Sequence, residues 1–307
     1  MITLTGSGSG DLFDALQERG QSSFEHGFVL EGFALLREAH EYAISTGDRR
    51  RADLAFCNLC SATVGFAGQE ALASHEMARL REILMRNEDG INCRLAAYVL
   101  SRAYELKKEA RKGLFYARIS LDRALALERR DWIASSHNQI GNLLMAQSFF
   151  DDAAEQYREA LELHPEEALE RRALIEINLA YADLMRGERR KAMSVLYRCL
   201  RLAQRLGALR EARLAHLDLC FALLESGRLT HALRHGSKGL SLAERLGDAD
   251  GVKNALYLLG ETSQLMGDPQ TARLYFDRLQ AEFYPDSTTV TDFLLAVDVR
   301  KIINLRA

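Results

Sequence analysis

The residues that decide the fold are NQIGNLL at positions 138–144, read together with the residues that follow them. Counted from Gly141, an alanine comes twelve residues later at Ala153, Tyr157 and Ala160 follow, and Pro165 closes the series. Two small residues at this spacing let two consecutive helices approach closely, because neither side chain holds the backbones apart. The stretch therefore predicts an antiparallel helix pair that ends near the proline.

The same unit recurs along the chain at intervals of 39 to 41 residues. A small residue stands at the place of Gly141 in every unit, which gives the series Gly20, Cys60, Ser101, Gly141, Ala180, Cys220 and Gly260. The second small position holds Gly32, Gly113, Ala153, Ala192, Ala232 and Ala272, and in the second unit it shifts to Ala71 or Ala73. Small residues at a fixed period predict a repeat protein.

Glycines mark the turns between the predicted helices. One series lies seven residues after the first small position and contains Gly27, Gly187, Gly227 and Gly267; another lies between units at Gly47, Gly207 and Gly247. Glycine ends helices well because it adopts left-handed backbone angles without strain. Since the chain of 307 residues contains only three prolines, nearly all of it is free to be helical.

Over residues 11–284 this pattern resembles the tetratricopeptide repeat (TPR) family, most clearly in repeats four to seven. The period near 40 is longer than the family's 34 residues. Together with linkers such as Leu246-Gly247-Asp248, it resembles the long TPRs of bacterial signalling regulators. The resemblance implies an all-α fold, a right-handed α-solenoid of seven antiparallel helix pairs.

We divide the chain into three parts. Residues 1–10 are expected to be a flexible N-terminal tail. The TPR-like superhelix covers residues 11–284, with repeats near 13–48, 53–88, 94–130, 134–166, 173–208, 213–248 and 253–284. Residues 285–307 are predicted to form a capping helix, running from Val290 to Leu305, that covers the last repeat. A homodimer contact through this apolar helix and a linker to a further domain are the alternatives.

TPR relatives bind partners in a concave groove lined by the first helix of each repeat. The resemblance places the following residues in this groove: Asn58, Tyr98, Arg102, Glu105, Asn138, Gln139, Asn142, Asn178, Tyr181, Asp218, Phe221, Asn254, Tyr257 and Glu261. An asparagine side chain offers both a donor and an acceptor to a peptide backbone, and aromatic side chains add apolar contact. The asparagine series is incomplete, because Val99 and Leu258 occupy equivalent positions.

No arrangement of residues predicts catalysis, a metal or a cofactor. Cys57 and Cys60 form a CxxC pair, but no second pair accompanies them, and Cys60 fills a small-residue position. His231 and His235 lie four residues apart without an evident third ligand. His216 precedes a small position by four residues, where TPRs often place a large aromatic, so we expect it to pack in the core. We therefore expect no enzyme.

Composition restricts the partner and the compartment. The formal net charge of −3 provides no excess of positive charge for nucleic acid or an anionic membrane. Five cysteines among helical patterns indicate a reducing compartment, the cytoplasm. The leading hypothesis is a non-catalytic scaffold or adaptor that binds a protein or peptide segment. The alternative is a regulatory module that senses a ligand or peptide in a bacterial signalling or transcription system.

Overall fold

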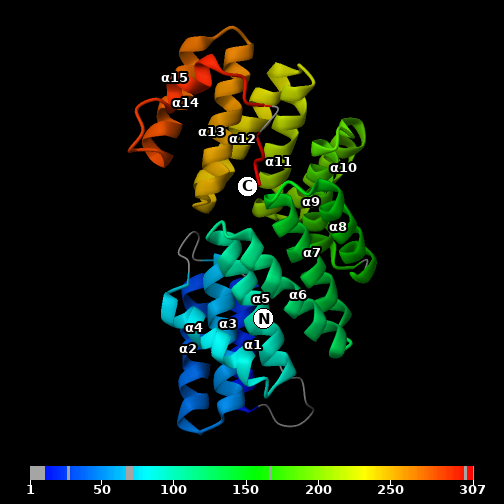
Figure 1. Ribbon diagram of the computed structural model, residues 1–307, viewed down its shortest axis with the longest axis vertical. Helices are drawn as coiled ribbons and strands as arrows, with labels where there is room; N and C mark the ends of the chain where they lie inside the picture. The colour runs from blue at the N-terminus through cyan, green and yellow to red at the C-terminus, as the bar shows by residue number, and fades with distance from the viewer. Residues whose placement is uncertain (1–10, 26–27, 67–71, 166, 301–302, 307) are drawn as a thin grey trace. The chain divides into compact units, whose positions relative to one another are not determined.

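The computed structural model describes residues 11–25, 28–66, 72–165, 167–300 and 303–306, and this part of the chain contains fifteen α-helices and no strand (Figure 1). The predicted all-α fold class is thus confirmed. The chain forms two compact units, residues 1–143 and 144–307, and the boundary falls inside helix α7. The tail predicted at residues 1–10 lies outside the described residues. Within the described part, no helix is both long enough and apolar enough to cross a bilayer.

The first unit is built from helices that pack on their neighbours in sequence. It contains α1 (Leu12–Glu25), α2 (Val29–Ser45), α3 (Arg49–Phe66), α4 (Ser74–Arg86), α5 (Gly90–Leu106), α6 (Ala110–Ala126) and most of α7 (Arg130–Ala146). Helix pairs α1–α2 and α5–α6 pack closely, whereas α4 packs mainly on α5 and hardly touches α3. The second repeat is therefore the irregular one, as its shifted small position indicates.

The second unit is more regular. Beyond the end of α7 it contains α8 (Phe150–Leu163), α9 (Leu169–Met185), α10 (Arg189–Leu206), α11 (Leu209–Glu225), α12 (Leu229–Leu246), α13 (Ala249–Leu265), α14 (Pro269–Phe283) and α15 (Val290–Ala296). From α8 to α15 each helix packs on the next, and α11 also packs on both α9 and α13. The first helices of these three repeats thus form one continuous layer.

The small residues are buried where the helices meet. All seven residues at the first small position are buried, and so are the six residues of the second series. A Cβ atom added to Gly260 would lie only 2.6 Å from Cδ1 of Phe276, and one on Gly32 would lie 2.7 Å from Cε2 of Phe24. The predicted role of the small residues as contact points is confirmed. In the second repeat, Ala73 only caps the start of α4, and Ala71 lies outside the described residues.

The predicted turns adopt left-handed backbone angles. Six glycines between helices have φ between +63° and +86°: Gly47, Gly187, Gly207, Gly227, Gly247 and Gly267. Lys108 and Ser148 stand at the same turn position of their repeats and adopt φ of +58° and +62° without being glycine. The geometry of the repeat therefore sets the turn, because it is kept even where the side chain disfavours it.

The C-terminal helix is shorter than its sequence predicts. We expected it to reach Leu305, but α15 ends at Ala296, and Val297 is extended with φ −124° and ψ 124°. The helix does cover the last repeat, because it packs on α14. Gln280 of α14 accepts a hydrogen bond from the backbone of Thr291 at 3.1 Å. The described residues beyond α15 are not helical, which leaves them free to follow another surface.

Candidate functional site

The chain beyond α15 returns to the layer formed by α9, α11 and α13. In Figure 1 it runs back along the second unit and ends beside these helices. Residues 304–306 form hydrogen bonds with side chains of all three helices. We call this place the inner-face site and define it by Tyr181 of α9, Asp218 of α11 and Asn254 of α13.

The inner-face site holds the backbone of Leu305 from two sides. The Leu305 N–H donates to the hydroxyl oxygen of Tyr181 at 2.8 Å. The Asn254 side-chain amide donates to the Leu305 carbonyl oxygen, also at 2.8 Å. Leu305 is only 7% exposed, so water replaces neither bond easily. Both hydrogen bonds are formed with backbone atoms, so they do not depend on which side chain stands at that position.

Asn304 fixes the segment at the end of α7. Its side-chain amide donates to the carbonyl oxygen of Met145 at 2.7 Å and lies 3.2 Å from the hydroxyl of Ser148. The Tyr181 hydroxyl in turn donates to Asn304 Oδ1 at 3.3 Å. The Tyr181 hydroxyl therefore accepts a hydrogen bond from Leu305 and donates one to Asn304.

Arg306 forms an ion pair with a buried carboxylate. Its Nη2 lies 2.9 Å and 2.7 Å from the two oxygens of Asp218, which is 1% exposed. Burial raises the pKa of Asp218 to about 6, and the nearby charges of Arg306 and Arg213 lower it. The Arg306 guanidinium also lies 4.8 Å from the ring centre of Tyr181, a cation–π distance. The site thus provides both a charge and a flat surface for an arginine.

Two polar groups on α13 beside this segment remain without a hydrogen bond. The Tyr257 hydroxyl and Oε1 of Glu261 are buried and have no partner among the described residues. Nε of Arg300 lies 3.8 Å from the other oxygen of Glu261, an ion pair without a close hydrogen bond. Burial raises the pKa of Glu261 to about 7, and it also raises that of Tyr257. Both oxygen atoms can accept a hydrogen bond from a better-placed donor.

The remaining predicted groove residues of the second unit lie on the same helices. Phe221 is buried against Tyr181, with 6.3 Å between ring centres. Asn178 is partly buried on α9. Of the seven residues predicted in this unit, Tyr181, Asp218, Asn254 and Glu261 contact the C-terminal segment through side-chain hydrogen bonds or ion pairs. These four residues come from helices α9, α11 and α13, and the role of the whole set as a partner groove stays a prediction.

In the first unit three of the seven predicted groove residues bond with one another. Arg102 donates to Glu105 at 2.7 Å, and Gln139 donates to the same carboxylate at 2.9 Å. Asn58 is fully buried and donates to Gln17 at 2.7 Å, so it is a core residue and not an open groove residue. Tyr98, Asn138 and Asn142 are partly buried. This unit shows no bound segment on its predicted groove residues within the described part.

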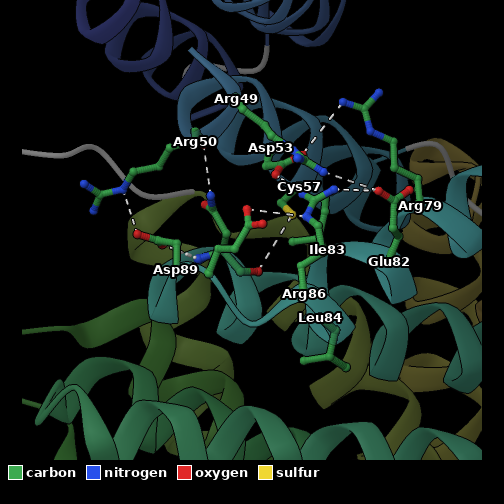
Figure 2. Close-up of polar contacts among 12 residues, drawn as sticks. Arg49, Arg50, Asp53, Cys57, Arg79, Glu82, Ile83, Leu84, Arg86 and Asp89 are labelled. Atoms are coloured by element: carbon green, nitrogen blue, oxygen red, sulfur yellow. Dashed lines mark hydrogen bonds and ion pairs between the residues drawn. The ribbon is translucent and has the colours of Figure 1, made fainter.

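A second polar cluster joins α3 and α4 in the first unit (Figure 2). Asp53 of α3 is buried and forms ion pairs with Arg86 and, at 4.0 Å, Arg79 of α4. Below it Cys57 is buried, and burial raises the pKa of its thiol. Burial likewise raises the pKa of Cys60 to about 12. A protonated, buried pair of thiols fits the packing role predicted for this CxxC.

His216, which is buried, and His235, which is partly buried, form a pair between α11 and α12. Their Nδ1 atoms lie 3.0 Å apart, so one ring donates and the other must be a neutral acceptor. His216 is 3% exposed, and burial, followed by the charges of His235 and Lys238, lowers its pKa to about 4. Burial also lowers the pKa of His235. His235 thus contacts His216 on the neighbouring helix, a contact that its spacing from His231 does not predict.

The histidine pair is expected to make stability depend on pH. Between pH 6.5 and 4 the unfolded chain binds a proton at position 216 that the folded chain does not, so stability falls as the pH drops through this range. Replacing His216→Gln should remove about 2 kcal/mol of this pH-dependent loss between pH 7.5 and 4.5, measured by urea unfolding. His75→Gln, at an exposed position of α4, is the control. Equal pH dependence in wild type and both variants would contradict the assignment.

The sequence interpretation missed the segment that occupies the inner-face site. The predicted helix reaches Leu305, and so includes Asn304 and Leu305, because apolar residues recur near the end of the chain. A contrary signal was available: Val297 to Arg300 alternate apolar and charged side chains, as extended chain does. Reading that alternation would have ended the helix before Val297 and left an extended C-terminal segment to be placed.

Comparisons with known proteins show a fold and no close relative. The sequence matches no protein-family model and no curated protein. Among solved structures, NprR in complex with its cognate peptide NprX has a TM-score of 0.70 at 12% identity, covering 94% of this chain and 83% of that one. Rap protein complexed with Competence and Sporulation Factor has a TM-score of 0.69 at 14% identity, covering 93% and 76%.

A third similar structure is a STAND protein with a tetratricopeptide repeat sensor from Pyrococcus horikoshii. Its TM-score is 0.57 at 15% identity, and the match covers 89% of this chain and 42% of that one. Sequence identities this low support a shared fold and nothing finer. With the buried small residues at their fixed period, these matches show that the chain has the TPR-type helical-repeat fold.

Proposed function

We propose that the chain is a non-catalytic peptide-binding scaffold, and that its inner-face site binds a segment of a partner protein. The observation that supports this most is the double contact to the backbone of Leu305 from Tyr181 and Asn254. Because both bonds go to main-chain atoms, any segment whose backbone takes the same local conformation can supply the same partners. The chain's own residues 304–306 show that a polypeptide fits there.

The structural comparisons agree with this proposal at the level of the fold. NprR was solved in complex with its cognate peptide NprX, and Rap protein was solved complexed with Competence and Sporulation Factor. A TPR-type fold therefore accommodates a peptide in at least one such protein. We extend this to the present chain on the strength of its own contacts.

The chemistry of the site favours a protein partner over nucleic acid. Asp218 and Glu261 place carboxylates at the inner face, and a phosphate backbone would be repelled there. The ionisable groups are engaged with an arginine or buried, and we assign none of them a catalytic step. We propose the cytoplasm as the compartment, and we retain a homodimer contact through α15 as an untested alternative.

Panning a displayed random-peptide library tests the proposed function. In full chains that carry Arg306→Ala to loosen the C-terminal segment, enriched peptides should bind about tenfold or more weakly when Tyr181→Phe and Asn254→Ala are added, because two backbone hydrogen bonds of about 1 kcal/mol each are lost. Tyr197→Phe on α10 is the matched control and should leave the affinity unchanged. Affinities are measured by fluorescence anisotropy.

Two results would refute the proposed function. The first is unchanged affinity in a folded Tyr181→Phe, Asn254→Ala chain, which places the peptides elsewhere. The second is the absence of any enriched peptide, both on the wild-type chain and on an Arg306→Ala chain in which the C-terminal segment is loosened.

A further inference from the structure

We infer that the inner-face site selects a segment in which an aliphatic residue is followed by arginine, and that residues 304–306 occupy it as a tethered competitor. This inference rests on the proposed function and names the class of peptide that the site takes. It also implies regulation, because a partner segment gains access only by displacing part of the chain itself.

The preference for arginine follows from the surroundings of Asp218. The carboxylate is 1% exposed and lies 2.7 Å from Nη2 of Arg306, and the Tyr181 ring lies under the guanidinium. A segment without a basic side chain would leave a buried charge unpaired, which costs much more than a missing surface contact. Lysine would restore the charge but not the flat stacking on the ring.

The preference for an aliphatic residue follows from the place of Leu305. Its backbone is held on both sides, so its side chain has a fixed position. That side chain is almost fully removed from water. An aliphatic group gains free energy from such burial, whereas a charged or strongly polar group would lose its hydration without a partner.

The tethered segment fills the site incompletely. Tyr257 and Glu261 each keep a buried oxygen without a hydrogen bond, although Arg300 lies nearby. A partner segment with a donor placed closer to these oxygens would satisfy them and bind better than the chain's own residues. Because the tether gives residues 304–306 a high effective concentration, a partner needs this advantage to displace them.

The test measures binding of a labelled nine-residue peptide, VRKIINLRA, which has the sequence of residues 299–307. Fluorescence anisotropy is recorded with full chains of wild type, Arg306→Ala and Asp218→Asn. Weakening the tethered competitor with Arg306→Ala should tighten peptide binding at least tenfold. A second peptide, with alanine in place of its penultimate arginine, should bind that chain at least tenfold more weakly than the first.

Asp218→Asn should abolish the difference between the two peptides, because the buried charge that selects arginine is gone. Arg201→Ala, on the exposed surface of α10, is the matched control and should behave as wild type. If Arg306→Ala unfolds the chain, Leu305→Ser provides a second way to loosen the segment. Circular dichroism establishes that each variant is folded before binding is compared.

Three outcomes would overturn the inference. Equal binding of the arginine and alanine peptides would show that the site does not select arginine. Unchanged affinity in folded Arg306→Ala and Leu305→Ser chains would show that residues 304–306 do not compete with the peptide. A wild-type chain that is dimeric by light scattering, and monomeric after Arg306→Ala, would place residues 304–306 in a second copy. Library peptides that need Tyr181 and Asn254 would still bind in the first two cases, so the proposed function would survive them.

Discussion

Replacing Gly260→Val is expected to lower the free energy of unfolding by about 3 kcal/mol or more, because no space exists for a side chain there. A Cβ atom at this position would lie 2.6 Å from Cδ1 of Phe276, whose ring is fully buried. Neither the ring nor the backbone of α13 can move without opening the contact between α13 and α14. Chemical denaturation of the full chain measures the loss.

A matched pair of variants separates this overlap from the intrinsic effect of glycine in a helix. Gly65 lies in α3, and a Cβ atom there meets nothing within 4 Å. Gly65→Ala should therefore stabilise the chain by about 0.5–1 kcal/mol. Gly260→Ala should instead destabilise it, and Phe276→Leu should partly relieve the overlap. If Gly260→Ala were as favourable as Gly65→Ala, the close approach of these helices would be disproved.

The sequence predicts the repeats well because their physical requirement is local. Close helix packing needs a small residue at a given place in each helix, and Gly260 and Ala272 stand where α13 and α14 meet. The left-handed turns are equally local, and Gly267 adopts one with φ of +80°. Each of these features depends on residues close together in the sequence, so the period alone reveals them.

The second repeat shows where that reasoning stops. Its small residue Cys60 is buried as predicted, but α4 packs mainly on α5 and barely on α3. Charged residues partly replace the missing small contact, because Asp53 of α3 pairs with Arg86 of α4. Ion pairs between helices have no fixed spacing in the sequence, so a repeat pattern does not predict them.

The sequence predicts the three residues that define the inner-face site, but it does not predict the segment that contacts them. Tyr181, Asp218 and Asn254 follow from their offsets to the small residues of three repeats. Leu305 lies 51 residues from Asn254 and 124 from Tyr181, so no periodicity connects them. An extended segment pairs through its backbone, and its sequence carries little information on where it binds. Asn58 was predicted to line the groove, but it is buried against Gln17. Gln17 belongs to the neighbouring repeat, so the position of Asn58 within its own repeat does not reveal this contact.

The occupied site changes how mutations in the C-terminal segment should be understood. Arg306 stabilises the chain by pairing with Asp218, and it also keeps other segments out of the same site. Variants of this segment are therefore expected to lose stability and gain peptide affinity together. A scaffold with an open groove would show no such connection between the two properties.

Amide hydrogen exchange at Leu305 measures whether helices α9, α11 and α13 of the second unit hold the backbone of the C-terminal segment. The Leu305 N–H donates to Tyr181 in a nearly dry environment, so we expect its exchange to be about 100-fold slower than in an unstructured chain. Tyr181→Phe should remove most of this protection while the helices stay protected, and Tyr197→Phe should not. Exchange of the wild-type Leu305 amide at the unstructured rate would contradict the account.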